Sequence, residues 1–323
     1  MTFISDLRTA FLRRGAPTER VPWRKAKWFY IFISPWMIGF LIFTLGPILV
    51  GIIMSFSNFN GMNFNSLQYV GTQNYVDAFQ DERAWEGFKL CLYFAALSIP
   101  LGLITSFFMA VLLTRSVRAQ GIFRTLYYIP SIIPVVASAW IWKLMWDNNF
   151  GMVNAGLDAI IPGTYVRWMT QLPIYVLIML GLWRAGGGSI IFMAGLQGVP
   201  KELDEAAIMD GANSIQRFRY VTLPMLTPVI FYQLIMAILG VGQILIEPML
   251  IFGQSREGGG GLNQSVPNNV YFFMVYIFNR VFTNLRFGYG FALLWLLFIF
   301  VIFLTLVVFS TARYWVHYEV SQD

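Results

Sequence analysis

Cysteine, histidine and charged residues are all scarce in this chain. It has one cysteine, Cys91, and one histidine, His317, among 323 residues. A single thiol cannot close an internal disulfide, and one histidine supplies neither a zinc site nor a histidine-based catalytic triad. Charged residues make up 12% of the chain, against about 25% in soluble domains. We therefore predict no metal site, no cofactor bound by this chain and no enzyme activity, with a membrane enzyme as the remotest alternative.

Nucleotide-binding and secretion motifs are also missing. The glycine run over 258–261 is not followed by Gly-Lys-Ser/Thr, and no phosphate-binding loop of that kind occurs elsewhere in the sequence. If this protein works with ATP, the ATPase must be another chain. The first apolar run is too long for a signal-peptide core and has no small-residue cleavage site nearby, so we expect a retained first helix.

Apolar residues make up 57% of the chain. Six runs reach the roughly 20 residues that a helix needs to span a bilayer. They are Lys27–Phe56, Leu90–Leu113, Thr125–Trp146, Leu172–Leu196, Met225–Phe252 and Phe287–Ala312. A seventh run, Val270–Phe278, is too short to span and is predicted to be either interfacial or a packed external segment. The pattern predicts an all-α polytopic membrane protein, with a tail over 1–27, a six-helix transmembrane domain over 28–313 and a tail over 314–323.

Lysine and arginine are unevenly distributed between the two sides of this topology. Alternate connections and the two ends carry most of them, as Arg8, Arg13, Arg14, Arg20, Arg24, Lys25, Lys27, Arg115, Arg118, Arg124, Lys201, Arg217, Arg219 and Arg313. Basic flanks mark the cytoplasmic side, so we predict that both termini are cytoplasmic. The formal net charge of +6 then reflects these flanks rather than a nucleic-acid partner. Arg280 and Arg286 are an exception on the opposite side.

The connection over 200–224 is unusually polar and has the signals of a helix at its start. Pro200 suits a first helical position, and the acids that follow it, Glu202, Asp204 and Glu205, fit a first turn, where the helix dipole favours negative charge. Ala206 and Ala207 then give the predicted helix a flat surface that another protein can approach closely.

The same connection has the signals of a turn and a second helix. Gly211 is predicted to end the first helix in the left-handed conformation, and Asn213 to cap a second helix that ends before Pro224. The physical alternative is an amphipathic loop that lies at the lipid headgroups. On the residues alone, this loop and a helix–turn–helix on the cytoplasmic side both stay open.

Fixed spacing in this connection resembles a family motif. Glu205-Ala206-Ala207 is followed after three residues by Gly211, and nine residues further on by Val221-Thr222-Leu223-Pro224. This pattern resembles the EAA loop of bacterial ABC importer permeases, which usually has isoleucine where Val221 stands. The segments YVGTQNYVDAF and FRTLYYIPSIIPVVASAWIWKLMW resemble the MalF-type first permease of the carbohydrate-uptake branch.

The resemblance implies the fold of a type I ABC importer permease in a bacterial inner membrane and the import of a sugar or oligosaccharide by alternating access. Its implied partners are a second, MalG-type permease chain, two ATPase subunits that use ATP and Mg, an extracytoplasmic substrate-binding protein, a carbohydrate substrate and membrane lipid. It also implies that the loop couples the ATPase to the spans. The coupling residues are then Glu205, Ala206, Ala207, Asp210, Gly211, Leu223 and Pro224.

Polar residues interrupt two of the predicted spans. Arg184 lies in the fourth run and Glu247 in the fifth, with Gln243 one predicted helical turn before Glu247. Ionisable residues are costly in a bilayer and by default mark functional sites. Two alternatives stay open, an ion pair that only joins the two spans and a polar lining of a substrate path. Because sugar sites also use aromatic faces, the substrate-path candidates are Trp183, Arg184, Gln243, Glu247, Tyr128 and Trp142, with Tyr127 also available.

An ion- or proton-coupled secondary transporter is the alternative from another class. Glu247 would then be its coupling carboxylate. That hypothesis calls for paired broken helices, for which we find no sequence signal, and it leaves the charged loop unexplained. The sequence does not identify the sugar, and an acidic one is among the options that Arg184 leaves open.

Overall fold

The computed structural model describes residues 23–62, 67–114, 118–255 and 264–317. The chain divides into two compact units, Met1–Ile53 and Met54–Asp323. Helices dominate the described residues of both units. The described strands are two short antiparallel segments, β1 (Gln254–Ser255) and β2 (Gln264–Ser265). The prediction of an all-α protein is therefore confirmed. Several of the basic residues predicted to be cytoplasmic, Arg8, Arg13, Arg14, Arg20 and Arg115, lie outside the described residues.

The described part of the first unit belongs to one long apolar helix. α2 (Trp23–Phe40) continues through a π-helical turn, η1 (Leu41–Leu45), into α3 (Gly46–Ser55). This turn lies just before Pro47, whose nitrogen has no hydrogen to donate, and the Gly46 N–H bonds instead to the Leu41 carbonyl. The helix Lys27–Ser55 is long and apolar enough to span a membrane.

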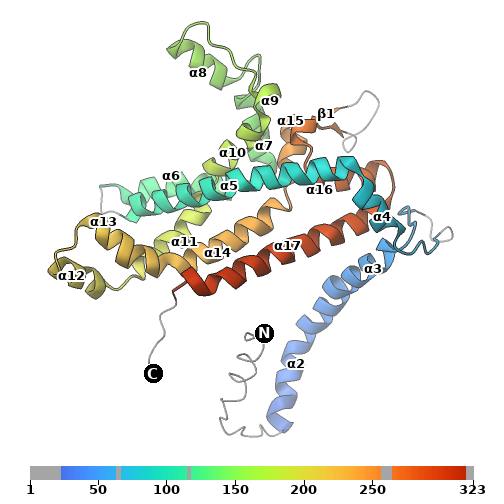
Figure 1. Ribbon diagram of the computed structural model, residues 1–323, viewed down its shortest axis with the longest axis horizontal. Coiled ribbons are helices and arrows are strands. Elements are labelled where there is room, and N and C mark those ends of the chain that lie inside the picture. The colour runs from blue at the N-terminus through green and yellow to red at the C-terminus, as the bar shows by residue number, and fades with distance from the viewer. Residues whose placement is uncertain (1–22, 63–66, 115–117, 256–263, 318–323) are drawn as a thin grey trace. The chain divides into compact units, whose positions relative to one another are not determined.

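Three long helices form the centre of the second unit. α5 (Glu82–Thr114), α14 (Leu223–Val241) and α17 (Phe287–Trp315) lie side by side in Figure 1. α11 (Gly186–Gln197) packs against both α5 and α14. Most apolar side chains on the outer faces of these helices are exposed, as expected where lipid rather than water surrounds them.

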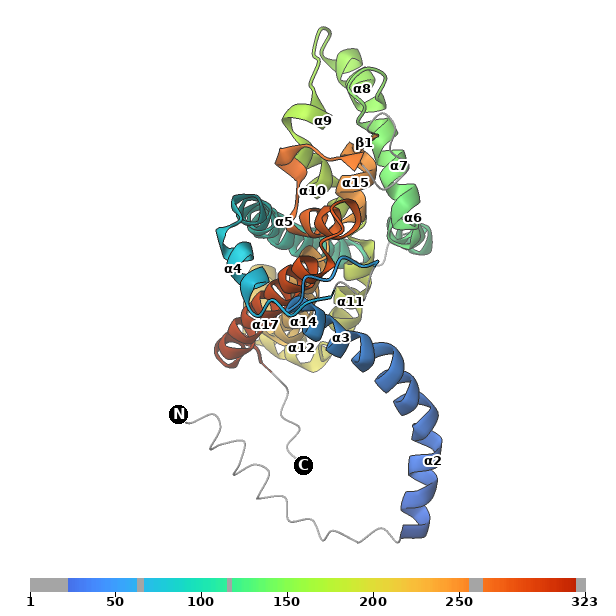
Figure 2. The ribbon, with the colours of Figure 1, turned by 90° about the vertical axis from the view of Figure 1, so that its right-hand side faces the viewer.

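Shorter elements connect and extend these helices. In Figure 2, α6, α7 and α8 rise along one side of the unit. The shorter elements are α4 (Gln73–Gln80), α6 (Gln120–Ile132), α7 (Val135–Met145), α8 (Met152–Ile160), α9 (Trp168–Gln171), α10 (Pro173–Trp183), α12 (Lys201–Met209), α13 (Ser214–Arg217), η3 (Phe218–Thr222), α15 (Ile246–Phe252), η4 (Asn268–Val270), α16 (Phe273–Phe278) and η5 (Asn279–Thr283).

Two of the predicted spans are bent rather than straight. The third breaks between α6 and α7, whose axes differ by 99°, and the fourth breaks by 44° between α10 and α11. Pro134 explains the first break, because the residue before a proline is pushed out of the helical conformation, and Ile133 has ψ 130°. The described residues contain four long candidate spans and these two bent pairs. The predicted number of six holds when each bent pair counts as one span.

The fifth span ends earlier than predicted. Its helix stops at Val241, and the separate helix α15 begins at Ile246. Gln243 and Glu247 therefore do not share one helical face, contrary to the prediction. Hydropathy could not reveal this break, because the residues on both sides of it are apolar. Three predicted spans are therefore broken, between α6 and α7, between α10 and α11 and between α14 and α15. The absence of broken helices, expected from the sequence, thus no longer argues against a secondary transporter.

α16 belongs to the core of the second unit. Its residues Phe273, Val275, Tyr276 and Ile277 are buried, and the helix packs against α5 and α17. Of the two placements predicted for residues 270–278, interfacial or packed and external, the packing is confirmed and the external side stays a prediction. The same core continues between α7, α10 and α15, and it is the larger of the two buried apolar clusters among the described residues.

Acidic residues neutralise the two exceptional arginines. Arg280 lies 3.7 Å from a carboxylate oxygen of Asp81, and Arg286 lies 3.5 Å from one of Asp77. Both acids belong to the acid-rich segment between the first two spans. The arginines that break the charge rule therefore form ion pairs with a neighbouring connection.

Asp81 is the centre of a small polar cluster between α4, α5, α16 and α17. Its carboxylate accepts hydrogen bonds from the hydroxyl groups of Tyr276 and Tyr289, and from the Ala84 N–H at the start of α5. Burial would raise the pKa of Asp81, but the bonds from the tyrosines and the charge of Arg280 hold that pKa below its ordinary value. The cluster therefore favours the charged carboxylate.

Candidate functional site

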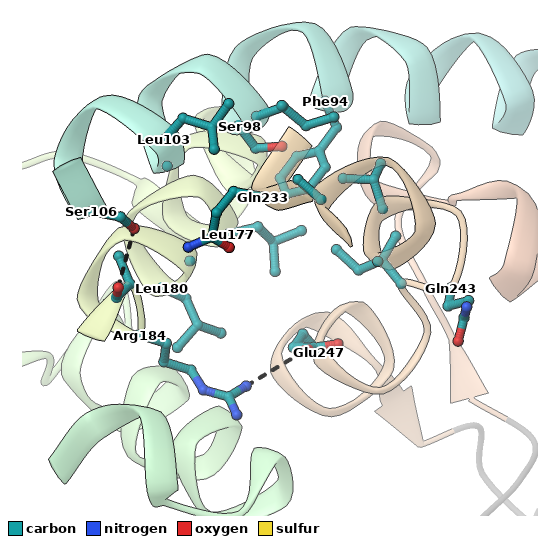
Figure 3. A pocket seen from close by; sticks show the side chains of 18 residues that line it. Phe94, Ser98, Leu103, Ser106, Leu177, Leu180, Arg184, Gln233, Gln243 and Glu247 are labelled. Carbon is teal, nitrogen blue, oxygen red and sulfur yellow. Dashed lines mark hydrogen bonds and ion pairs between the residues drawn. The ribbon is translucent and has the colours of Figure 1, made fainter. Parts of the chain in front are cut away.

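A cavity of about 420 Å³ lies among the helices of the second unit. Its wall is built mainly from α5, α10, α14 and α15 (Figure 3). Most of the wall is apolar, and the polar side chains on it are Ser98, Ser106, Arg184, Gln233, Gln243 and Glu247. A largely apolar cavity with a few convergent polar groups is typical of a site for a small molecule.

Arg184 and Glu247 face each other across this cavity, as Figure 3 shows. Arg184 follows the last residue of α10, Glu247 lies in the first turn of α15, and Nη1 and Oε1 are 3.8 Å apart. Their side chains are 26% and 23% exposed. The two residues therefore pair and also line the cavity, and the role of this cavity as a substrate path stays a prediction. Within the described residues, Arg184 Nε is buried without a hydrogen-bond partner, so the guanidinium keeps an unused donor.

Polar side chains from two other helices hold the bend beside Arg184. The Ala185 carbonyl accepts a hydrogen bond from Ser106 Oγ of α5 at 3.1 Å. The Gly188 carbonyl accepts one from Gln233 Nε2 of α14 at 2.8 Å. A bent helix inside a membrane needs such partners for its backbone. The bend thus ties the fourth span to α5 and α14 at the wall of the cavity.

Gly186 lets the bent span approach α6 closely. A Cβ added at this residue would collide with the backbone carbonyl oxygen of Tyr127 and would lie 3.2 Å from Cα of Tyr128. Gly186 itself is buried. The glycine run after Arg184 is therefore explained, at this position, by contact between two backbones.

The aromatic candidates do not line the cavity. Trp142 is 5% exposed and donates its indole N–H to the Val176 carbonyl at 2.9 Å. The ring of Trp183 lies 5.3 Å from that of Trp142, so both belong to the core between α7 and α10. Tyr128 is exposed on α6, and Tyr127 lines a separate pocket beside the end of α5. Of the six candidates, the structure brings Arg184, Gln243 and Glu247 to one cavity, where Figure 3 shows Gln243 apart from the ion pair.

Ser98, Ser106 and Gln233 line the cavity but were not predicted from the sequence. All three are uncharged, and hydroxyl and amide groups are common enough in spans to carry little signal. Of the three, only Gln233 could have been predicted to face the interior, because an amide inside an apolar run usually faces another helix.

The loop over 200–224 begins as predicted, with small differences. α12 starts at Lys201, so Pro200 is its N-cap rather than its first residue. Gly211 has φ 79°, which confirms the predicted left-handed turn. Asn213 caps α13, because its side chain accepts from the Gln216 N–H and its own N–H donates to the Gln216 side chain.

The second helix of the loop does not end before Pro224, contrary to the prediction. Residues Ser214–Val241 form one helix of 28 residues. The Leu223 N–H bonds to the Phe218 carbonyl, and this wider π turn makes room for a proline that has no N–H to donate. The second half of the loop and the fifth span are therefore a single element.

The predicted coupling residues lie at one end of the second unit, around α12 and α13 (Figure 1). Glu205, Ala206, Asp210 and Gly211 are exposed, whereas Ala207, Leu223 and Pro224 are half-buried. Large apolar side chains are exposed nearby, as Leu203, Ile208, Met209, Ile215 and Tyr220. Exposed apolar surface rimmed by polar groups is typical of sites that contact another protein or a membrane.

Spanning helices around a polar-lined cavity, with a structured loop at one end, define a polytopic membrane permease. The described residues contain no group of side chains able to hold a metal ion. Residues 98–317 match the family described as binding-protein-dependent transport system inner membrane component. The chain belongs to this family.

Curated relatives and solved structures agree with this assignment. The probable ABC transporter permease protein YesP of Bacillus subtilis is 35% identical over 299 residues, which cover 91% of this chain and 93% of that protein. The lactose transport system permease protein LacF of Rhizobium radiobacter is 30% identical over 291 residues, with 88% and 93% covered. A permease chain in the crystal structure of a bacterial alginate ABC transporter has a TM-score of 0.76 at 22% identity, with 90% and 96% covered.

These findings decide between the classes predicted from the sequence. The resemblance to ABC importer permeases and the fold are confirmed. The chain is a transport subunit of a binding-protein-dependent system in the inner membrane, and not itself an enzyme. The family does not support an ion- or proton-coupled secondary transporter.

Proposed function

We propose that this chain is the MalF-type permease of a carbohydrate importer and that its cavity is part of the substrate path. The observation that carries the proposal is the meeting of Arg184, Glu247 and Gln233 at one cavity between spanning helices. Together they offer hydrogen-bond donors and acceptors to sugar hydroxyl groups. A volume of about 420 Å³ suits a small ligand. The names of the relatives that transport lactose and trehalose or maltose support a sugar.

The proposed partners are a second, MalG-type permease chain, two ATPase subunits and an extracytoplasmic binding protein. ATP and Mg are used by the ATPase subunits, since this sequence has no phosphate-binding loop of the Gly-Lys-Ser/Thr kind. The exposed surface around Glu205, Ala206 and Gly211 is the proposed docking site for one ATPase subunit. A solved alginate transporter in complex with its periplasmic protein supports the remaining partner.

Both termini and the loop over 200–224 are proposed to lie in the cytoplasm. Figure 1 places α12, the start of α6 and the end of α17 at the same end of the second unit. Lys201, Arg124 and Arg313 belong to these segments, and basic residues concentrate on the cytoplasmic side.

The test is uptake by the assembled transporter in vesicles, with a panel of neutral and acidic sugars and the binding protein outside. We expect uptake that needs ATP inside and survives the collapse of ion gradients. Arg184→Gln is expected to lower the uptake rate about tenfold or more, because a charged donor to the substrate is lost. Tyr128→Phe is the matched control, since this side chain does not line the cavity. Equal losses in both variants would contradict the cavity as the path.

A further inference from the structure

One side-chain ion pair joins α12 to the following helix. Asp204 accepts two hydrogen bonds from the guanidinium of Arg217, one from Nε at 2.7 Å and one from Nη2. This two-pronged geometry fixes orientation as well as distance. No residue of α12 is buried. Among the described residues, no other side-chain hydrogen bond or ion pair links α12 to another element.

Arg217 stands near the start of a helix that reaches the cavity. The helix Ser214–Val241 is uninterrupted, and from Arg217 to Ala237 it rises about 30 Å. Ala237 and Gln233 line the cavity, and Gln233 also holds the Gly188 carbonyl at the bend of the fourth span. A displacement applied near Arg217 is therefore applied to the same continuous helix, which includes the π turn η3 and forms part of the cavity wall.

We propose that Asp204 and Arg217 are positioning residues that transmit a displacement of α12 into the fifth span and so to the cavity. The inference rests on the proposed function, in which α12 docks on an ATPase subunit. The backbone link between the two helices passes through the left-handed Gly211, with nothing within 4 Å of where its Cβ would be. Two backbone hydrogen bonds close this turn, from the Gly211 N–H to the Ile208 carbonyl and from the Ala212 N–H to the Ala207 carbonyl. The ion pair adds a side-chain link that holds α12 in a fixed orientation to the following helix, so the two move together.

The exposure of the pair separates this role from a role in folding. The two side chains are 28% and 36% exposed, and exposed ion pairs contribute little to folding stability. The hydrogen bonds from Arg217 lower the pKa of Asp204, so the pair is intact at neutral pH. We expect its loss to leave the folded protein and the docking face intact while it loosens the link between them.

The experiment uses the assembled transporter, purified through a tag on this chain and reconstituted in lipid nanodiscs. Ala237→Cys, in a background without Cys91, reports on the far end of the helix. The rate of its reaction with a maleimide is measured without nucleotide and after trapping with ATP and vanadate. Co-purification of ATPase subunits is measured on the same samples.

The variants separate the pair from charge in general. Asp204→Asn, Arg217→Gln and the double variant break the pair, and Asp204→Glu keeps a carboxylate. Glu202→Gln and Arg219→Gln are the matched controls, since they remove the same charges from the same two helices. Neither Glu202 nor Arg219 forms an ion pair within the described part of the chain.

We expect trapping to change the labelling rate at least about fivefold in the reporter protein, in both controls and in Asp204→Glu. The change is expected to be lost in Asp204→Asn and Arg217→Gln, with no further loss in the double variant, because the two residues act as one unit. ATPase subunits are expected to co-purify with every variant.

Three results would overturn the inference. A full nucleotide-dependent change in Asp204→Asn would show that the pair transmits nothing. Loss of the ATPase subunits from Asp204→Asn or Arg217→Gln would assign the pair to docking instead. Loss of the change in Glu202→Gln or Arg219→Gln as well would assign the effect to charge alone. If the reporter protein itself co-purifies with no ATPase, the proposed function fails, and the inference fails with it.

Discussion

The glycine run at the bend of the fourth span offers a direct test of the helix packing. At Gly186 an added Cβ would collide with the carbonyl oxygen of Tyr127 and lie 3.2 Å from Cα of Tyr128. Both are backbone atoms of α6, so no side chain can rotate away and α11 must move. At Gly187 the nearest atom to an added Cβ is Ser131 Cβ at 3.8 Å, which is an ordinary contact. Two adjacent glycines therefore predict opposite results for the same substitution.

The expected magnitude follows from two opposing contributions. Overpacking of a buried contact costs about 1–3 kcal/mol, and alanine in place of a helical glycine contributes up to about 1 kcal/mol of stability. Gly186→Ala incurs the collision and is expected to be destabilising by about 1–2 kcal/mol. Gly187→Ala has the propensity gain without the collision, so we expect it to be neutral or slightly stabilising.

The assay is thermal unfolding of the purified protein in detergent, followed as the fraction that stays monodisperse after heating. Gly186→Ala is expected to lower the midpoint, and Gly187→Ala to leave it unchanged or raise it. Equal midpoints for wild type and Gly186→Ala would refute the close approach of α11 to α6. An equal loss in both variants would assign the glycines to backbone conformation rather than to packing.

Three further predictions concern the loop, the acidic cluster and the topology. Glu205→Ala is expected to weaken co-purification of the ATPase subunits, because an interfacial charge is lost. Gly211→Val is expected to abolish ATP-driven uptake and Gly211→Asn to retain it, since a φ of 79° disfavours β-branched residues. Normal uptake in both Glu205→Ala and Gly211→Val would contradict the coupling role. Asp81→Asn is expected to cost about 1–3 kcal/mol at neutral pH. The pKa of Asp81 is lowered in the folded state. The contribution of its carboxylate to folding stability is therefore complete above the ordinary pKa of 3.8 and is lost as pH falls through the lowered pKa. Melting midpoints of Asp81→Asn that equal those of wild type throughout a pH series would refute this. In a cysteine-free background, Ser214→Cys is expected to react only from the cytoplasm and Thr164→Cys only from outside, and the reverse pattern would overturn the topology.

Local signals in the sequence were sufficient for the turn in the coupling loop. The left-handed Gly211 and the cap at Asn213 depend on residues within a few positions, and both are present. The prediction that the second helix ends before Pro224 is wrong. The π turn η3 forms there and accommodates the proline, so the helix continues. Whether such a turn forms depends on packing along the whole span, which a local pattern does not contain.

The cavity was only partly predictable. Arg184 and Glu247 stood out because a charge inside an apolar run is rare. Trp142 and Trp183 were poor candidates in a chain with 17% aromatic residues, because tertiary packing alone decides which rings face one another. The pair of Asp204 and Arg217 was not predicted, since its two residues meet only after the turn at Gly211 has folded.

The continuous helix from Ser214 to Val241 makes the number of residues between the loop and the cavity wall part of the site. Arg217 and Gln233 are 16 positions apart, which corresponds to about 4.4 helical turns. Deletion of one residue between them would rotate everything beyond it by about 100° and shift it by about 1.5 Å. Gln233 would then point away from the Gly188 carbonyl, although no side chain of the site had been changed. A surface loop tolerates such a deletion. In this helix, the loss of one residue would turn every later side chain of the helix toward a different neighbour.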